Sequence, residues 1–150
     1  MNYYYYKNVT QPKVISTSFS DDSDTISFDL KSTYQVPSLL TLTRTNTYVR
    51  IAQSQSVVIQ DRVKFTTPTT YEFGIPSRNG VWTDFSVSPN LLFGKFTVDS
   101  VSLNVRISAS NPFVHKAVTK TINGVTYTRL GVSMSNPILE DIITVTFFND

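Results

Sequence analysis

The chain has 150 residues, a formal net charge of +2 and no cysteine. This length suits a single domain, and the lack of cysteine excludes disulfides, thiolate nucleophiles and thiolate metal sites. Val, Ile, Thr, Phe, Tyr and Trp supply 66 of the residues, whereas alanine and glutamate are scarce, so the composition predicts a nearly all-β domain. Lysine and arginine are scattered without a cluster, which disfavours direct nucleic-acid binding.

The first dozen residues lack the alternation of a strand, so residues 1–12 are expected to form an extended arm and residues 13–150 the β-domain. The arm carries four consecutive tyrosines, Tyr3, Tyr4, Tyr5 and Tyr6. Tyrosine is enriched at protein interfaces because it combines a large apolar ring with a polar tip. We therefore expect the arm to lie across a neighbouring subunit. No signal peptide or membrane helix is predicted, since no suitable apolar run is present.

Apolar and polar residues alternate with period two in several segments, as in half-buried strands. These segments are 26–30, 63–65, 71–75, 81–87, 101–109 and 143–147. Asn123-Gly124, between β-rich flanks, predicts a type I′ hairpin that pairs 113–122 with 125–134. In all, eight to ten strands separated by turns indicate an antiparallel β-sandwich.

Near the C-terminus, Pro137 to Asp141 is expected to form a single helical turn before the last strand. Ile142 and Phe148 add apolar groups to the opposite face of that strand. A strand that is apolar on both faces is typical of a central or interface position. Ile142 and Phe148 are therefore candidate subunit-interface residues.

Few residues are suited to catalysis. His115 is the single histidine and lies within an expected strand, where it is interpreted as a polar residue on the strand face rather than a triad base. A glycosidase needs a pair of carboxylates, but nothing in the sequence brings Glu72 or Glu140 near a second carboxylate in a cleft. Glu72 should point to the opposite face from Tyr71 and Phe73, toward solvent. The sequence therefore predicts neither catalytic residues nor a cofactor.

Two further features have alternative interpretations. Asp21, Asp22 and Asp24 offer oxygen ligands for calcium, but their spacing differs from that of an EF-hand loop, and acidic residues of this kind commonly form a turn. The turn is favoured. Trp82 is out of phase with Val81 and is expected on the exposed face, where it either packs against a neighbouring loop or subunit or contacts a glycan.

Ser, Thr and Asn supply 48 residues of this alanine-poor, cysteine-free chain, which has an N-terminal arm and an apolar last strand at 142–148. This profile resembles that of single jelly-roll virion proteins of the capsid or vertex (penton) type. The resemblance implies an eight-stranded jelly roll made of two four-stranded sheets, and a structural protein assembled into virions in the host cytoplasm. The arm and its junction have only Lys7 and Lys13, unlike the arginine-rich arms of many such coats.

These observations predict a structural virion subunit that forms homo-oligomers and contacts other virion proteins through its arm and sheet surfaces. The alternatives are a carbohydrate-binding sandwich or fibre head, for which Trp82 would be the ligand-contacting aromatic, and a glycoside hydrolase.

Overall fold

The computed structural model describes residues 11–149, which form eleven β-strands and one short 3-10 turn. The first group of elements is β1 (Lys13–Phe19), β2 (Ser23–Asp29), η1 (Lys31–Thr33), β3 (Leu39–Val49), β4 (Ser56–Thr69) and β5 (Glu72–Arg78). The second group is β6 (Val81–Ser88), β7 (Leu91–Val98), β8 (Val101–Ala109), β9 (Phe113–Ile122), β10 (Val125–Met134) and β11 (Ile138–Phe148).

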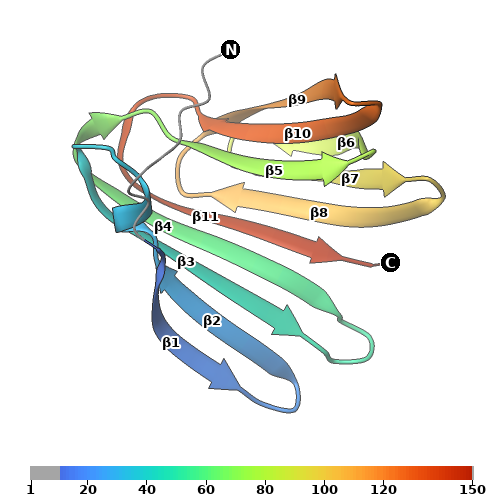
Figure 1. The fold of residues 1–150 in the computed structure, drawn as a ribbon, viewed down its shortest axis with the longest axis horizontal. Helices are drawn as coiled ribbons and strands as arrows, with labels where there is room; N and C mark the ends of the chain where they lie inside the picture. The colour runs from blue at the N-terminus through green and yellow to red at the C-terminus, as the bar shows by residue number, and fades with distance from the viewer. Residues whose placement is uncertain (1–10, 150) are drawn as a thin grey trace.

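The strands form two antiparallel sheets that pack as a sandwich (Figure 1). The large sheet has the order β1-β2-β3-β4-β11-β8-β7-β6, and the small sheet has the order β5-β10-β9. The expected all-β antiparallel sandwich is confirmed. The division into sheets of eight and three strands differs from the two sheets of four that a simple jelly roll would have.

A paired ribbon nevertheless passes from one sheet to the other. In the large sheet β4 pairs with β11, and the strands that follow and precede them, β5 and β10, pair in the small sheet. Antiparallel ribbons wrapped in this way build jelly-roll sandwiches. The meander β1–β2–β3 and the hairpin β6–β7 then extend the large sheet at its two ends, which accounts for its having more than four strands.

Two local predictions match the structure closely. The β9–β10 hairpin pairs Ile122 with Val125 and Phe113 with Met134, and its turn residues Asn123 and Gly124 have φ values of 50° and 76°. Positive φ at both turn positions is the requirement of the type I′ turn. The expected strand at 101–109 is β8.

The helical turn expected from Pro137 to Asp141 is wrong. Strand β11 already begins at Ile138, whose side chain is buried and whose backbone pairs with Thr69 of β4. A register irregularity follows between Ile138 and Glu140. The long partner strand therefore overrides the local tendency of Pro-Ile-Leu-Glu-Asp to turn.

The core lies between the small sheet and the inner face of the large sheet. Its fully buried apolar side chains come from β7, β8, β10 and β11: Leu92, Val105, Ile107, Leu130, Val132, Ile143 and Val145. Strand β11 lies between β4 and β8, which is the central one of the two positions expected for the last strand. After the register irregularity its odd-numbered residues Asp141, Ile143 and Val145 are buried toward the core, and Ile142 faces outward.

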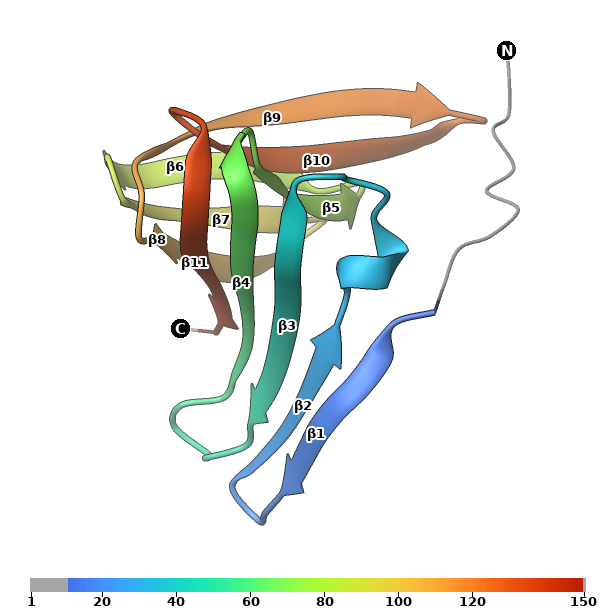
Figure 2. The same ribbon diagram turned by 90° about the vertical axis from the view of Figure 1, so that its left-hand side faces the viewer.

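The small sheet is too narrow to cover the whole large sheet. Strands β1, β2 and β3, here called the wing, extend beyond it (Figure 2). Every residue of β1 is exposed, and every residue of β2 is only half-buried although β2 has a neighbour on each side. An internal strand without a buried residue indicates that β1 and β2 lack a complete covering layer on either face, whereas Leu39 and Leu42 at the start of β3 belong to the core.

Candidate functional site: a cleft beside the free edge of β5

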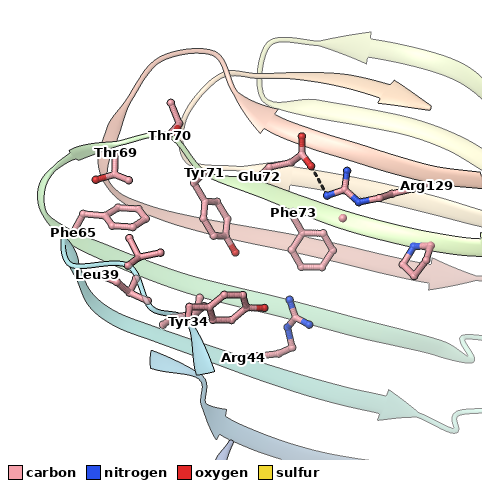
Figure 3. Close-up of a pocket in the computed structure, with 14 residues that line it drawn as sticks. Tyr34, Leu39, Arg44, Phe65, Thr69, Thr70, Tyr71, Glu72, Phe73 and Arg129 are labelled. Atoms are coloured by element: carbon pink, nitrogen blue, oxygen red, sulfur yellow. Dashed lines mark hydrogen bonds and ion pairs between the residues drawn. The ribbon is translucent and has the colours of Figure 1, made fainter. Parts of the chain in front are cut away.

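A cleft of about 660 Å³ lies where the small sheet ends and the wing begins (Figure 3). Apolar side chains from β3 and β4 form its floor, the segment after η1 contributes Tyr34, and β5 forms the opposite wall. Its lining residues include Tyr34, Leu39, Leu42, Arg44, Phe65, Tyr71, Glu72, Phe73, Gly74, Pro76 and Arg129. The cleft is within the range of about 300–1,000 Å³ typical of small-molecule sites.

On the side of the cleft next to the wing, a buried carboxylate accepts hydrogen bonds from two residues that line the cleft. Asp61 of β4 is fully buried and lies directly opposite Arg44 of β3. Arg44 donates two hydrogen bonds to it, from Nε to Oδ1 at 2.7 Å and from Nη2 to Oδ2 at 2.7 Å. The Tyr71 hydroxyl donates to Oδ2 at 2.8 Å. Such bidentate, charge-assisted pairing offsets the large desolvation penalty of a buried carboxylate.

These contacts hold the partners of Asp61 in one protonation state. The hydrogen bond to Asp61 raises the pKa of Arg44, and the negative charge of Asp61 acts in the same direction. Burial raises the pKa of Tyr71 well above its usual range, and the adjacent Asp61 charge raises it further. Tyr71 therefore remains a proton donor to Asp61 throughout the ordinary pH range.

One aromatic ring packs against the Arg44 guanidinium, and two others pack together beside the cleft. The Arg44 guanidinium carbon lies 5.0 Å from the centroid of the Phe73 ring, within the distance of a cation–π contact. Phe65 and Tyr71 pack together with their ring centroids 6.4 Å apart. Tyr34, by contrast, is 49% exposed, so its ring borders the cleft without being part of the core.

The rim on the β5 side is formed by an ion pair between Arg129 of β10 and Glu72 of β5. Ser133 also donates to Glu72 Oε2 at 2.7 Å. The Ser133 hydrogen bond and then the Arg129 hydrogen bond lower the pKa of Glu72, so it remains a carboxylate at neutral pH. As predicted, Glu72 faces away from buried Phe73, on the exposed side of β5.

Glycine makes room for this ion pair. A Cβ atom at Gly74 would lie 2.7 Å from Arg129 Nη2, and one at Gly131, the cross-strand partner of Gly74, would lie 3.1 Å from Glu72 Oε2. The two glycines therefore allow Arg129 and Glu72 to lie close over the strands at the rim of the cleft.

A second polar cluster joins the two sheets at the opposite end of the sandwich. Asp84 of β6 accepts a hydrogen bond from the Trp82 indole Nε1, and its other oxygen lies 2.9 Å from His115 Nε2 of β9. His115 is thus a polar residue with a carboxylate partner. A hydroxyl nucleophile is not among the partners of this pair, so the cluster links the two sheets and provides no triad.

The expectation that Trp82 lies on the exposed face is wrong. Its ring packs on Phe96 with centroids 5.0 Å apart and contacts the core from the inner face of β6. A Cβ atom at Gly94 would lie 2.4 Å from Trp82 Cζ2. Edge strand β6 instead exposes its apolar residues Val81 and Phe85, which reverses the face assignment made from alternation.

This arrangement predicts a large effect of Gly94→Ala. The added methyl would lie 2.4 Å from Trp82 Cζ2 and 2.6 Å from the backbone oxygen of Thr83, and the backbone cannot easily move. We expect a loss of about 1–3 kcal/mol in the free energy of unfolding, measured by urea denaturation. Gly124→Asn is the control, because that turn position is open and asparagine tolerates its positive φ; an equal loss in both variants would contradict the prediction.

The remaining residues singled out from the sequence are dispersed. Tyr3 to Tyr6 lie outside the described residues. Glu140 is exposed, with Lys64 Nζ 4.0 Å away, and the described residues contain no group of three or more potential metal ligands among His, Cys, Asp and Glu. Asp24 forms an ion pair with Arg50, so the acidic segment is a turn whose last aspartate is held by a salt bridge. Phe148 lines a shallow apolar groove in the large sheet, where β3 and β11 end and β4 begins.

The residues that form the cleft were not recognised from the sequence. Asp61 was the available signal, because it is in phase with Ile59 and Val63 in a strand whose inward positions are otherwise apolar. An acidic residue on an apolar strand face implies a buried partner. The sequence offers no means of choosing Arg44 and Tyr71 as those partners, since the sheet pairing and the packing of the two sheets bring them together.

Among residues 11–149, no helix is long and apolar enough to cross a membrane.

No protein-family model matches the chain, and no curated protein matches it. Several solved structures are similar to it in fold, and two of them are forms of a heparinase III gene product. A heparinase III gene product matches with a TM-score of 0.61 and 16% identity, covering 93% of this chain and 22% of that protein. Its form with methylated lysines matches with a TM-score of 0.56 and 15% identity, covering 93% and 21%. The chain thus spans about a fifth of those proteins, and what it shares with them is a β-sandwich fold.

Proposed function

We propose that this protein is a structural virion subunit without a catalytic role, which assembles with copies of itself and with other virion proteins. The observation that supports this best is the uncovered wing. A sheet that extends beyond its covering layer exposes apolar side chains that a solitary domain would normally bury. Within the wing, Phe19 is 72% exposed, and Val14, Ile15 and Tyr48 are also exposed.

The wing leads into an apolar groove of about 400 Å³. Tyr48, Val57 and Phe147 lie side by side on β3, β4 and β11, and Leu103 and Phe148 complete its apolar lining. Gln55, Ser56 and Asn149 supply polar groups. An apolar centre with polar groups beside it is the composition of a protein–protein interface.

The occupant that we propose is the tyrosine-rich arm of a second copy. Strand β1, which follows the arm in sequence, begins at Lys13 and forms the free edge of the wing. Tyrosine rings match the apolar lining, and their hydroxyls match the polar groups beside it. Exchange of arms between identical subunits gives a contact that repeats around a symmetric assembly.

The virion assignment also draws on composition. The chain is rich in Ser, Thr and Asn, has no cysteine, and lacks the clustered basic residues of a genome-binding protein. Its sandwich contains the paired ribbon that jelly rolls have. The proposed place of the protein is therefore the protein shell or vertex, after assembly in the host cytoplasm.

Deleting residues 1–12 is expected to convert the assembled protein into a monomer, because the deletion removes the groove's occupant. Light scattering after size-exclusion chromatography measures the mass, and negative-stain electron microscopy shows whether rings or shells are lost. Val57→Asp should have the same effect by placing a charge in the groove.

Val81→Asp is the matched control, since Val81 is an exposed strand valine on β6, outside the groove. It should leave assembly unchanged. A full-length protein that remains monomeric at high concentration, or an assembly indifferent to both the deletion and Val57→Asp, would contradict the proposal.

A further inference from the structure

We propose that the cleft between β5 and the wing is a binding site for a neutral sugar, namely a pyranose unit of a glycan. This site is separate from the groove assigned to the arm: the lining of the cleft and that of the groove have no residue in common. The inference is therefore independent of the assembly role.

The first argument is the mixture of surfaces in the cleft. The floor includes Leu39, Leu42 and Phe65, and the half-exposed Tyr34 ring stands at its border. A pyranose has an apolar C–H face that packs on such a ring and an edge of hydroxyls that requires hydrogen-bond partners. Sites of this kind combine apolar walls with a small number of placed polar groups.

The second argument is the polar groups and their fixed positions. Arg44 uses Nε and Nη2 for Asp61 and rests on Phe73, which leaves Nη1 to donate into the cleft. Arg129 uses Nη2 for Glu72, which leaves its remaining N–H groups, and the Glu72 carboxylate retains lone pairs to accept from a hydroxyl. Groups already held in place lose little entropy when a ligand binds.

The backbone of β5 adds further partners. The Met134 N–H donates to the Tyr71 carbonyl and the Asn79 N–H donates to the Thr126 carbonyl, so the odd-numbered residues of this segment face β10. The N–H and C=O groups of the even-numbered Glu72 and Gly74 therefore point to the free edge, beside the cleft. Pro76 occupies the next such position and has no N–H, which limits the pairing of another strand there.

The third argument, charge balance, identifies the sugar as neutral. The guanidiniums of Arg44 and Arg129 are matched by the carboxylates of Asp61 and Glu72. An acidic ligand would meet guanidiniums whose charge a carboxylate already offsets, and a cationic ligand would meet carboxylates that a guanidinium already offsets, so neither charge gains much net attraction. An uncharged, hydroxyl-rich ligand uses the remaining donors and acceptors without breaking either ion pair.

The test is binding of the full chain to an array that carries neutral hexose and N-acetylhexosamine oligosaccharides beside uronate-containing and sulfated ones. Isothermal titration calorimetry with the best neutral oligosaccharide then gives the affinity. We expect neutral glycans to bind, and Tyr34→Ala to weaken binding by roughly tenfold or more, as for loss of an aromatic anchor.

Tyr127→Ala is the matched control, because Tyr127 is 43% exposed on β10 and lies outside the cleft. It should bind as the unmodified protein does, and thermal unfolding of both variants checks that each is folded. Absence of binding to every neutral glycan at millimolar concentration, equal affinity of Tyr34→Ala and the unmodified protein, or preference for acidic glycans would overturn the inference.

If the protein assembles but binds no neutral glycan, only this inference is overturned. If it binds a neutral glycan but remains monomeric, only the proposed assembly is overturned. A rise in glycan affinity after deletion of residues 1–12 would show that the arm competes with the sugar for the cleft, and would overturn the assignment of the arm to the groove.

Discussion

Replacing Asp61 by alanine is expected to lower the free energy of unfolding by about 3–5 kcal/mol, the range for removing one partner of a buried ion pair. The substitution leaves Arg44, which is only partly exposed beside the cleft, without its bidentate acceptor, and it leaves the Tyr71 hydroxyl without an acceptor. Urea denaturation followed by circular dichroism measures the change.

Asp22→Ala is the control for a carboxylate on the exposed β1–β2 turn, and we expect it to change stability by less than about 0.5 kcal/mol. An apolar replacement of the whole network, Asp61→Leu with Arg44→Met and Tyr71→Phe, should recover much of the lost stability, because no buried polar group is then left unpaired. A loss below about 1 kcal/mol in Asp61→Ala would show that water enters and solvates the network.

Ile143→Ala is expected to destabilise the protein by about 2–5 kcal/mol, the range for truncating a buried isoleucine. Ile143 is 0% exposed on the inner face of β11, paired with Asp61 on one side and Ala109 on the other. The cavity left in the middle of the large sheet cannot close easily, since strands on both sides hold the backbone in place. Equilibrium unfolding in urea is again the measurement.

Ile142→Ala provides a control from the next residue of the same strand. Ile142 is 37% exposed on the outer face, so its truncation should lower stability by less than about 1 kcal/mol. If this outer face takes part in assembly, as the sequence predicts, Ile142→Ala weakens assembly while the fold remains stable. Equal destabilisation by both substitutions would show that the outer face of β11 is also covered in the folded monomer.

The sequence predicted well the elements whose signal is local. The β9–β10 hairpin follows from Asn123-Gly124, because few residues adopt positive φ at both turn positions. Strand β8 follows from nine residues of strict alternation. The all-β class follows from composition.

Elements whose state depends on distant partners were predicted less well. Ile138 to Asp141 has the composition of a turn, but pairing with β4 makes it the start of β11. Trp82 lies inward because Phe96 and Gly94 of β7 provide its packing site, while neighbouring Val81 remains exposed at the edge of the sheet. In both places the partner strand decides the conformation, and alternation within one strand carries no information about that partner.

By itself, the sequence determined that this protein is an antiparallel sandwich without cysteine chemistry, because composition and period-two alternation act over a few residues at a time. Only the tertiary structure decided that the sheets are unequal, that a wing remains uncovered, and that Arg44, Asp61 and Tyr71 meet beside the free edge of β5. The physical reason is that burial, ion pairing and edge exposure depend on which strands lie opposite one another. That choice is made by the packing of the whole chain, through contacts between residues far apart in sequence.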